Sequence, residues 1–127
     1  MHKKKILIVD DEPDILKLTS LRLRKLGYDV LTAVNGQEGL ESIRVEKPDL
    51  VLLDLILPIM SGADVCRKIK NDEKLEHIPI ILFTASCDTI TAEKAKILGA
   101  EDYMVKPFNP KELMNKVERI LTEGVVL

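Results

Sequence analysis

Short runs of apolar residues alternate with longer amphipathic segments from one end of the chain to the other. Three of the runs, ILIV, LVLL and IILF, are continuously apolar. Continuous runs are typical of strands that are covered on both faces, as in a parallel sheet between layers of helices. We predict five strands, over residues 5–9, 29–33, 49–53, 79–84 and 101–105.

Helix signals fill the gaps between these strands. Pro13 suits the first turn of a helix, whereas Gly27 and Gly99 suit helix ends. The signals predict a first helix that opens at residues 12–14 and ends near Gly27, helices over about residues 36–46, 62–71 and 89–98, and a last helix from Pro110. Strand–helix units in succession predict an α/β fold, a doubly wound parallel sheet with right-handed crossovers.

Composition narrows the class of protein. The 127 residues are enough for one domain, and 46% apolar with 31% charged residues is an ordinary globular composition. The net charge of −2 offers no basic surface for nucleic acid or for an anionic membrane. The apolar runs are too short for a membrane helix or for the core of a signal peptide. We therefore expect a cytoplasmic protein that does not contact nucleic acid or membrane directly.

Two cysteines, Cys66 and Cys87, lie far apart in the chain and outside any C-x-x-C motif. No histidine lies at ligand spacing from either of them, so the pattern favours two reduced side chains over a zinc or redox site.

Reactive side chains follow the predicted strands at the point where each strand ends. The carboxyl ends of parallel strands meet at one edge of an α/β sheet, and ligands bind there. We therefore expect side chains from distant parts of the chain to converge at this edge. They are Asp10, Asp11 and Glu12 after the first strand, Asp54 after the third, Thr84 at the end of the fourth and Lys106 after the fifth.

This set of side chains suits phosphoryl chemistry. Carboxylates packed together repel one another unless a cation joins them, and a few carboxylate oxygens suit Mg²⁺. An aspartate can attack phosphorus, and the product is an aspartyl phosphate. Such a reaction needs cations and hydrogen-bond donors on the phosphoryl oxygens, which Mg²⁺, Lys106 and Thr84 would supply. The chain has no glycine-rich loop after the first strand and no Ser-His-Asp set.

Four segments at the strand ends resemble one known family. They are Val9-Asp10-Asp11-Glu12, Asp54 to Gly62 (DLILPIMSG), Thr84-Ala85 and Tyr103 to Phe108 (YMVKPF). Together, and in this order, they are similar to the receiver domain of two-component response regulators, and the likeness covers residues 4–122. The resemblance implies a flavodoxin-like (βα)5 fold with strand order 2-1-3-4-5, and a single receiver domain over residues 1–127 with a short C-terminal tail.

The resemblance also implies a role for each carboxylate. Asp54 corresponds to the residue that accepts the phosphoryl group. Asp11 and Asp54 would bind Mg²⁺ through their side chains, and Ile56 would bind it through its main-chain carbonyl. Asp10 would act mainly through water in the outer shell of the metal.

The remaining matched residues would respond to the phosphoryl group. Lys106 would pair with it, Thr84 would move to donate a hydrogen bond to it, and Tyr103 would then turn inward. The resemblance further implies a cis peptide between Lys106 and Pro107. Ile56 and Ser86 would flank the path of the water that removes the phosphoryl group, and we expect the apolar Ile56 to slow that hydrolysis.

The function implied is a phosphorylation-activated signalling switch. A sensor histidine kinase or a histidine phosphotransfer protein would load Asp54, and the face of the fourth helix, fifth strand and fifth helix would change and control a downstream protein or output domain. Such a domain catalyses its own phosphorylation and dephosphorylation but is not an enzyme with an external substrate. Homodimerisation on phosphorylation is left open by the sequence.

Three other functions are alternatives to a phosphorylated receiver domain. A phosphatase of the haloacid dehalogenase type would carry a second aspartate two residues after the first, where Ile56 stands. A flavodoxin-type cofactor binder would need a phosphate-binding loop and stacking aromatic residues, and the chain has only two Tyr and two Phe and no Trp. A receiver-shaped interaction module that works without phosphorylation stays open.

Overall fold

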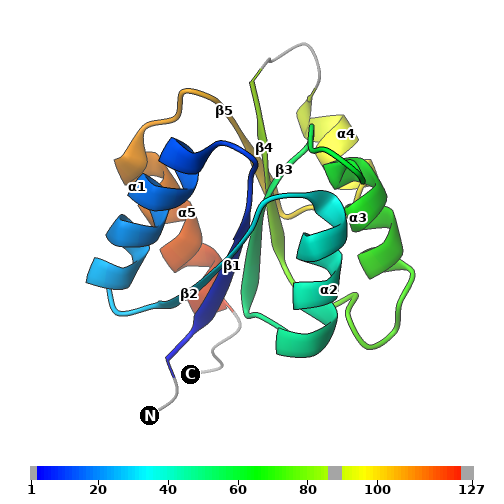
Figure 1. Ribbon diagram of the computed structural model, residues 1–127, viewed down its shortest axis with the longest axis horizontal. Coiled ribbons are helices and arrows are strands. Elements are labelled where there is room, and N and C mark those ends of the chain that lie inside the picture. Colours follow the sequence, from blue (N-terminus) through cyan, green and yellow to red (C-terminus); the bar gives the residue numbers. More distant parts are fainter. Residues whose placement is uncertain (1–2, 86–89, 124–127) are drawn as a thin grey trace.

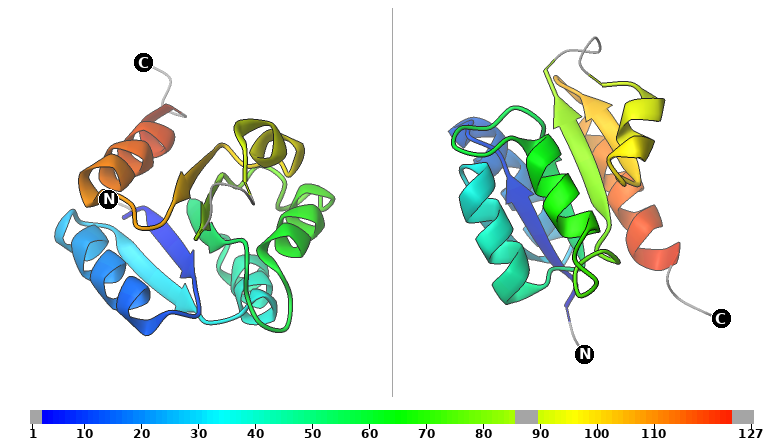
Figure 2. Two further views of the ribbon diagram at one scale, coloured as in Figure 1. Left: turned by 90° about the horizontal axis from the view of Figure 1, so that it is seen from above. Right: turned by 90° about the vertical axis from the view of Figure 1, so that its right-hand side faces the viewer.

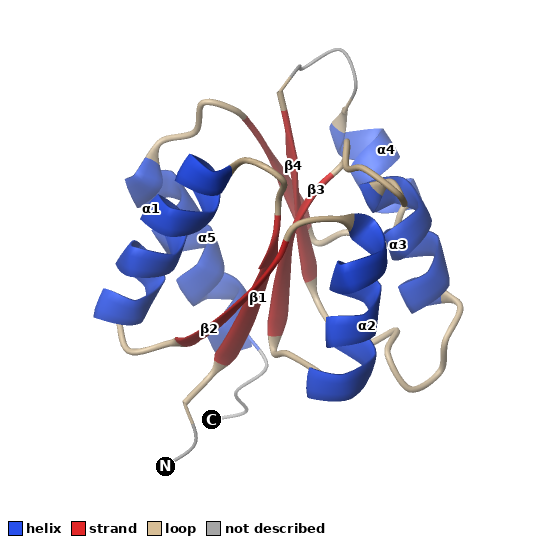
Figure 3. Cartoon of the chain, viewed as in Figure 1, coloured by secondary structure: helices blue, strands red, loops and turns tan. Residues whose placement is uncertain are grey.

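The computed structural model describes residues 3–85 and 90–123. In these residues five strands alternate with five helices, as the sequence predicts (Figure 3). The strands are β1 (Lys5–Val9), β2 (Asp29–Ala33), β3 (Leu50–Asp54), β4 (Ile80–Thr84) and β5 (Asp102–Val105). The helices are α1 (Pro13–Lys25), α2 (Gly36–Glu46), α3 (Gly62–Lys70), α4 (Ala92–Ile97) and α5 (Pro110–Glu123).

The strands form one parallel sheet in the order β2-β1-β3-β4-β5. Helices α1 and α5 cover one face, and α2, α3 and α4 cover the other (Figures 1 and 2). This arrangement confirms both the doubly wound class and the flavodoxin-like strand order. Within the described parts of the chain, no helix is long and apolar enough to cross a bilayer.

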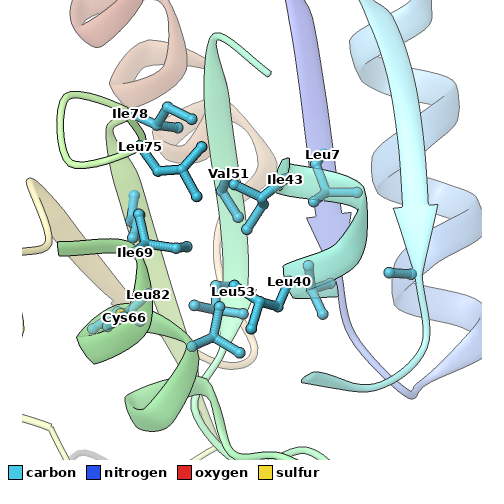
Figure 4. Close-up of a cluster of buried hydrophobic side chains, with 14 of the residues drawn as sticks. Leu7, Leu40, Ile43, Val51, Leu53, Cys66, Ile69, Leu75, Ile78 and Leu82 are labelled. Carbon is cyan, nitrogen blue, oxygen red and sulfur yellow. The ribbon is translucent and has the colours of Figure 1, made fainter. Parts of the chain in front are cut away.

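The continuous apolar runs serve two cores at once, because successive side chains of a strand point to opposite faces. In β1, Ile6 and Ile8 pack into the core beneath α1 and α5. Leu7 and Val9 pack into the core beneath α2, α3 and α4 (Figure 4). The residues of β3 divide between the two cores in the same way, and all five are buried. The central strands β1 and β3 are therefore firmly held, and so are Asp10 and Asp54 at their carboxyl ends.

Most element boundaries lie within one residue of the prediction, and the start of α4 differs by three residues. Helix α4 begins at Ala92 and not at residue 89, because Thr91 is its N-cap: the backbone there is extended and the hydroxyl accepts a hydrogen bond from the Lys94 N–H. Strand β3 begins one residue later than expected and includes Asp54, which pairs in register with Phe83 of β4. The phosphoacceptor candidate is thus the last residue of a central strand.

Cys66 is free and buried in α3, and burial raises the pKa of its thiol to about 12, so the thiol stays protonated and unreactive. Cys87, Ser86 and the expected start of the fourth helix at Thr89 lie outside the described residues, as does the C-terminal tail from Gly124.

The loop between β3 and α3 packs closely on the start of α2 and on the end of β3. A Cβ atom on Gly62 would collide with the main-chain carbonyl oxygen of Asp54, and one on Gly36 would collide with that of Met60. Both positions therefore require glycine for the backbones to approach. Ile59, in the middle of the loop, has a φ of 72° and is 75% exposed. A β-branched residue in this left-handed region is strained.

The Met60 N–H donates to the Pro58 carbonyl at 2.8 Å, so Ile59 is the central residue of a γ-turn. Replacing Ile59 by Gly is expected to stabilise the protein, because glycine adopts a positive φ without strain and the isoleucine side chain buries little surface. We expect the free energy of unfolding to rise by about 1 kcal/mol, as measured by urea denaturation. Ile97→Gly is the matched control, since Ile97 is 76% exposed in α4 and its φ is not positive. Equal effects of the two substitutions would contradict the assignment of strain to Ile59.

Candidate functional site

The sheet order brings four strand ends together at one edge of the molecule. Asp10 follows β1, and Asp54 ends the neighbouring strand β3. Thr84 ends β4, and Lys106 follows β5 at the sheet margin. The predicted convergence is therefore present, because Lys106 contacts both aspartates across β4.

The Lys106 ammonium group is the centre of this site. Its Nζ atom donates hydrogen bonds to Asp10 Oδ2 at 2.7 Å, to Asp54 Oδ2 at 2.8 Å and to Glu12 Oε1 at 2.9 Å. Only 8% of the lysine side chain is exposed. Burial on its own disfavours the charged form, but the bonds to Asp10, Asp54 and Glu12 outweigh it and raise the pKa of Lys106 above its usual value. The lysine is therefore a permanent cation of the site.

Each buried carboxylate also accepts a hydrogen bond from the main chain. The Glu12 N–H donates to Asp10 Oδ1 at 2.9 Å, and the Ile56 N–H donates to Asp54 Oδ1 at 3.0 Å. Asp10 is completely buried, and desolvation raises its pKa even though Lys106 and the Glu12 N–H act in the opposite direction. Keeping Asp10 ionised in the folded protein therefore costs free energy.

The charges of the site do not balance. Three carboxylates surround one ammonium group, which leaves a net charge of −2 in a partly buried space. One oxygen from each of Asp10, Glu12 and Asp54 lies within 4.8 Å of the others. The carboxylate oxygens are hard ligands, and their negative charge exceeds the positive charge of the lysine. This donor set therefore suits a divalent cation such as Mg²⁺.

Asp11 and Glu12 differ in how they are placed relative to Lys106. Asp11 is exposed, and its carboxylate is not in the close group of oxygens. Glu12, which received no role of its own at the site, contacts Lys106 directly. The strand periodicity gives no signal for this difference, because β1 ends at Val9 and the turn that follows decides the direction of each side chain.

Of the other predicted residues, Ile56 and Thr84 lie at the same edge, whereas Tyr103 lies further back along β5, beside Leu82. Ile56 contacts Asp54 through its main-chain N–H, and its side chain is 66% exposed. Thr84 is buried, and its main-chain carbonyl accepts a hydrogen bond from the Lys106 N–H at 2.7 Å. Tyr103 is half-buried in β5 against the core beneath α2, α3 and α4. The peptide between Lys106 and Pro107 is cis, as the resemblance implies.

Curated relatives of this chain are transcriptional response regulators. The chain is 42% identical over 123 residues to the alkaline phosphatase synthesis transcriptional regulatory protein PhoP of Bacillus subtilis, which covers 97% of this chain and 50% of PhoP. It is also 42% identical over 115 residues to the DNA-binding response regulator MtrA of Mycolicibacterium smegmatis, covering 91% and 49% of the two chains. The chain thus spans about half the length of the curated relatives it matches.

Solved structures share the whole fold. The chemotaxis response regulator CheY4 of Vibrio cholerae matches with a TM-score of 0.86 and 29% identity, over 94% of this chain and 99% of CheY4. The response regulator TrrA of Thermotoga maritima, solved in complex with Mg²⁺ and BeF, matches with a TM-score of 0.82 and 38% identity, over 92% and 98% of the chains.

The sequence model of the response regulator receiver domain matches residues 6–118, which is most of the chain and contains all of the strand residues except Lys5. The lysine-centred acidic edge, the strand order and the relatives agree with that match, and the chain therefore belongs to the receiver domain family of two-component response regulators.

Proposed function

We propose that Asp54 accepts a phosphoryl group from the phosphohistidine of a sensor histidine kinase or of a histidine phosphotransfer protein. The observation that carries the proposal is the place of Asp54: a buried carboxylate at the end of a central strand, with the Lys106 ammonium 2.8 Å from its Oδ2 atom. In this proposal the chain is one domain of about residues 4–122 that works in the cytoplasm.

In the proposed step, an Asp54 carboxylate oxygen attacks phosphorus in line with the phosphorus–nitrogen bond. A new oxygen–phosphorus bond forms, the phosphorus–nitrogen bond breaks, and its electron pair stays on the histidine ring. Lys106 is placed to neutralise charge that accumulates on the phosphoryl oxygens. The Ile56 N–H holds the other carboxylate oxygen, so the attacking group has a fixed orientation.

A metal ion would complete this arrangement. Asp54, Asp11 and the Ile56 carbonyl would hold Mg²⁺, with Asp10 acting through water, and the ion would supply positive charge to the phosphoryl oxygens. The excess negative charge of the site supports this assignment. Asp11 is exposed and adjoins Asp10 in the chain, so it is accessible to an ion that enters from solvent.

The same site would remove its phosphoryl group by hydrolysis. Water attacks phosphorus, the bond to Asp54 breaks, and inorganic phosphate leaves. Ile56 contacts the acceptor through its main-chain N–H, and its exposed apolar side chain offers water no hydrogen bond, so we expect it to slow this step. The domain would remove only its own phosphoryl group. It would thus be an autophosphatase without an external substrate.

The output would pass through the β5 side of the sheet. Thr84 and Tyr103 would change position on phosphorylation and alter the face made by α4, β5 and α5. Asp102 ties two of these elements together, since its Oδ2 atom accepts hydrogen bonds from Lys116 at 2.7 Å and Arg119 at 2.8 Å. A downstream protein, an output domain or a second copy of the chain would bind this face, and nucleic acid would not be a direct partner.

The first test is loading of Asp54 by acetyl phosphate with Mg²⁺, followed by intact mass. One added phosphoryl group is expected on the wild-type protein, and none on Asp54→Asn or in EDTA. Beryllofluoride is the second probe, because it mimics the phosphoryl group without being hydrolysed. If neither probe labels the wild-type protein, the proposal is wrong and a receiver-shaped module that works without phosphorylation is left.

Asp10→Asn is expected to stabilise the metal-free protein while impairing Mg²⁺-dependent loading. The raised pKa of Asp10 means that its ionised form is less favourable in the folded than in the unfolded state. The substitution should therefore raise the free energy of unfolding at pH 7, as measured by urea denaturation. The difference should shrink as pH falls through the raised pKa of Asp10, and it should vanish below pH 3.8, the ordinary pKa of an aspartate, where both states are protonated.

Asp102→Asn is the matched control with the opposite sign. Burial raises the pKa of Asp102, but hydrogen bonds from Lys116, the Tyr103 N–H and Arg119 outweigh it, so the pKa is lowered. The ionised form stabilises the fold above pH 3.8, and that contribution disappears as pH falls through the lowered pKa. Asp102→Asn should thus destabilise the protein at pH 7, and a stabilising effect would contradict this account.

A further inference from the structure

All three protons of the Lys106 ammonium group are already in use. A lysine has three N–H donors, and Nζ donates to Asp10, Glu12 and Asp54 at distances of 2.7 to 2.9 Å. A phosphoryl group that is to pair with Lys106 needs one of these donors. The lysine must therefore give up a carboxylate when the phosphoryl group arrives.

The three carboxylates differ in what their release would cost. Asp10 is completely buried, so losing Lys106 would leave its charge without a counterion in a desolvated space. Asp54 is the attacking group itself, so the lysine has to stay beside it while the incoming phosphoryl group is being transferred. The Glu12 side chain is 56% exposed, and water can hydrate it as soon as it leaves. Release of Glu12 is therefore the least costly.

The backbone at Glu12 leaves its side chain free to make this exchange. Glu12 is the N-cap residue of α1, yet its carboxylate accepts no capping hydrogen bond from the helix. Its main-chain N–H is bound to Asp10 Oδ1, and Pro13 follows it at the first helical position. The main chain is thus fixed at both sides, and only the side chain has to move. The carboxylate instead binds a lysine 94 positions away in the sequence.

We infer that Glu12 is the exchangeable partner of Lys106, a positioning residue that holds the lysine beside Asp54 in the unmodified protein and is displaced by the phosphoryl group. The inference rests on the proposed function. Two consequences follow. The glutamate competes with the phosphoryl group for one donor, and its negative charge opposes the approach of a phosphodonor. Both effects slow loading of the site.

Glu12→Gln tests this role, because the amide has the same shape and can accept a hydrogen bond but carries no charge. We expect initial loading by acetyl phosphate at saturating Mg²⁺ to be about two- to five-fold faster than in the wild-type protein, the range for an exposed ion pair. Asp14→Asn is the matched control, since Asp14 is an exposed acid in the first turn of α1. That variant should load at the wild-type rate.

The Mg²⁺ dependence of loading separates this role from two others. If Glu12→Gln loads no faster at saturating Mg²⁺ and needs several-fold more Mg²⁺, Glu12 is a metal ligand and the inference is wrong. If it loads more slowly at every Mg²⁺ concentration and also loses stability, Glu12 is only structural and the inference is again wrong. If the wild-type protein is not loaded at all, the proposed function fails and the inference fails with it.

Displacement can also be observed directly by carboxyl NMR of protein labelled with ¹³C-glutamate. The Glu12 signal is identified by its absence in Glu12→Gln. With Mg²⁺ and beryllofluoride it should move to the position of the solvent-exposed glutamates, while ¹⁹F NMR reports the adduct on Asp54. An unmoved Glu12 signal in the presence of that adduct would overturn the inference and leave the phosphoacceptor role of Asp54 intact.

Discussion

The site depends on one ammonium group that binds carboxylates from separate parts of the chain. Lys106 follows β5, the last strand of the chain. Asp10 follows β1, Asp54 is the last residue of β3, and these two strands are neighbours inside the sheet. Without the lysine, two buried carboxylates would face each other with no counterion, which is strongly unfavourable. The parallel order of the strands, the close approach at Gly62 and the buried central strands all serve to bring these charges to one place.

The arrangement also shows how stability and function oppose each other at this edge. Desolvation makes the ionised form of Asp10 unfavourable, and the site carries two more negative than positive charges. The fold tolerates the cost because each central strand contributes side chains to two apolar cores. The excess negative charge is what suits the site to the divalent cation of the proposed function, so removing it would stabilise the chain and weaken that fit.

Much of the fold could be predicted from the sequence because its signals are local. Continuous runs such as ILIV identify buried parallel strands, and prolines and glycines mark helix ends, so the alternation of elements followed directly. The strand order depends on long-range pairing and needed the resemblance to a family. The start of α4 was misplaced because the capping hydroxyl of Thr91 decides it, and apolar periodicity does not report caps.

The candidate site could be predicted as a set of strand ends but not as a set of contacts. The topological rule placed Asp10, Asp54 and Lys106 at one edge, and the structure brings them within hydrogen-bond distance. It could not predict that Glu12 contacts the lysine while Asp11 faces solvent. Past the end of a strand the alternation of faces stops, and the direction of each side chain depends on the turn that follows.

Strands β3 and β5 differ in how firmly the sheet holds them. Strand β3, which ends in Asp54, is hydrogen-bonded to a strand on each side, whereas β5 lies at the margin and pairs only with β4. Shifting β3 would break two ladders, whereas shifting β5 would strain one short ladder and would move Met104 and the partly buried Tyr103 and Val105. In the proposed function, a reaction at Asp54 would therefore displace β5 more readily than β3. Amide hydrogen exchange would register the difference as slow exchange along β3 and faster exchange along β5.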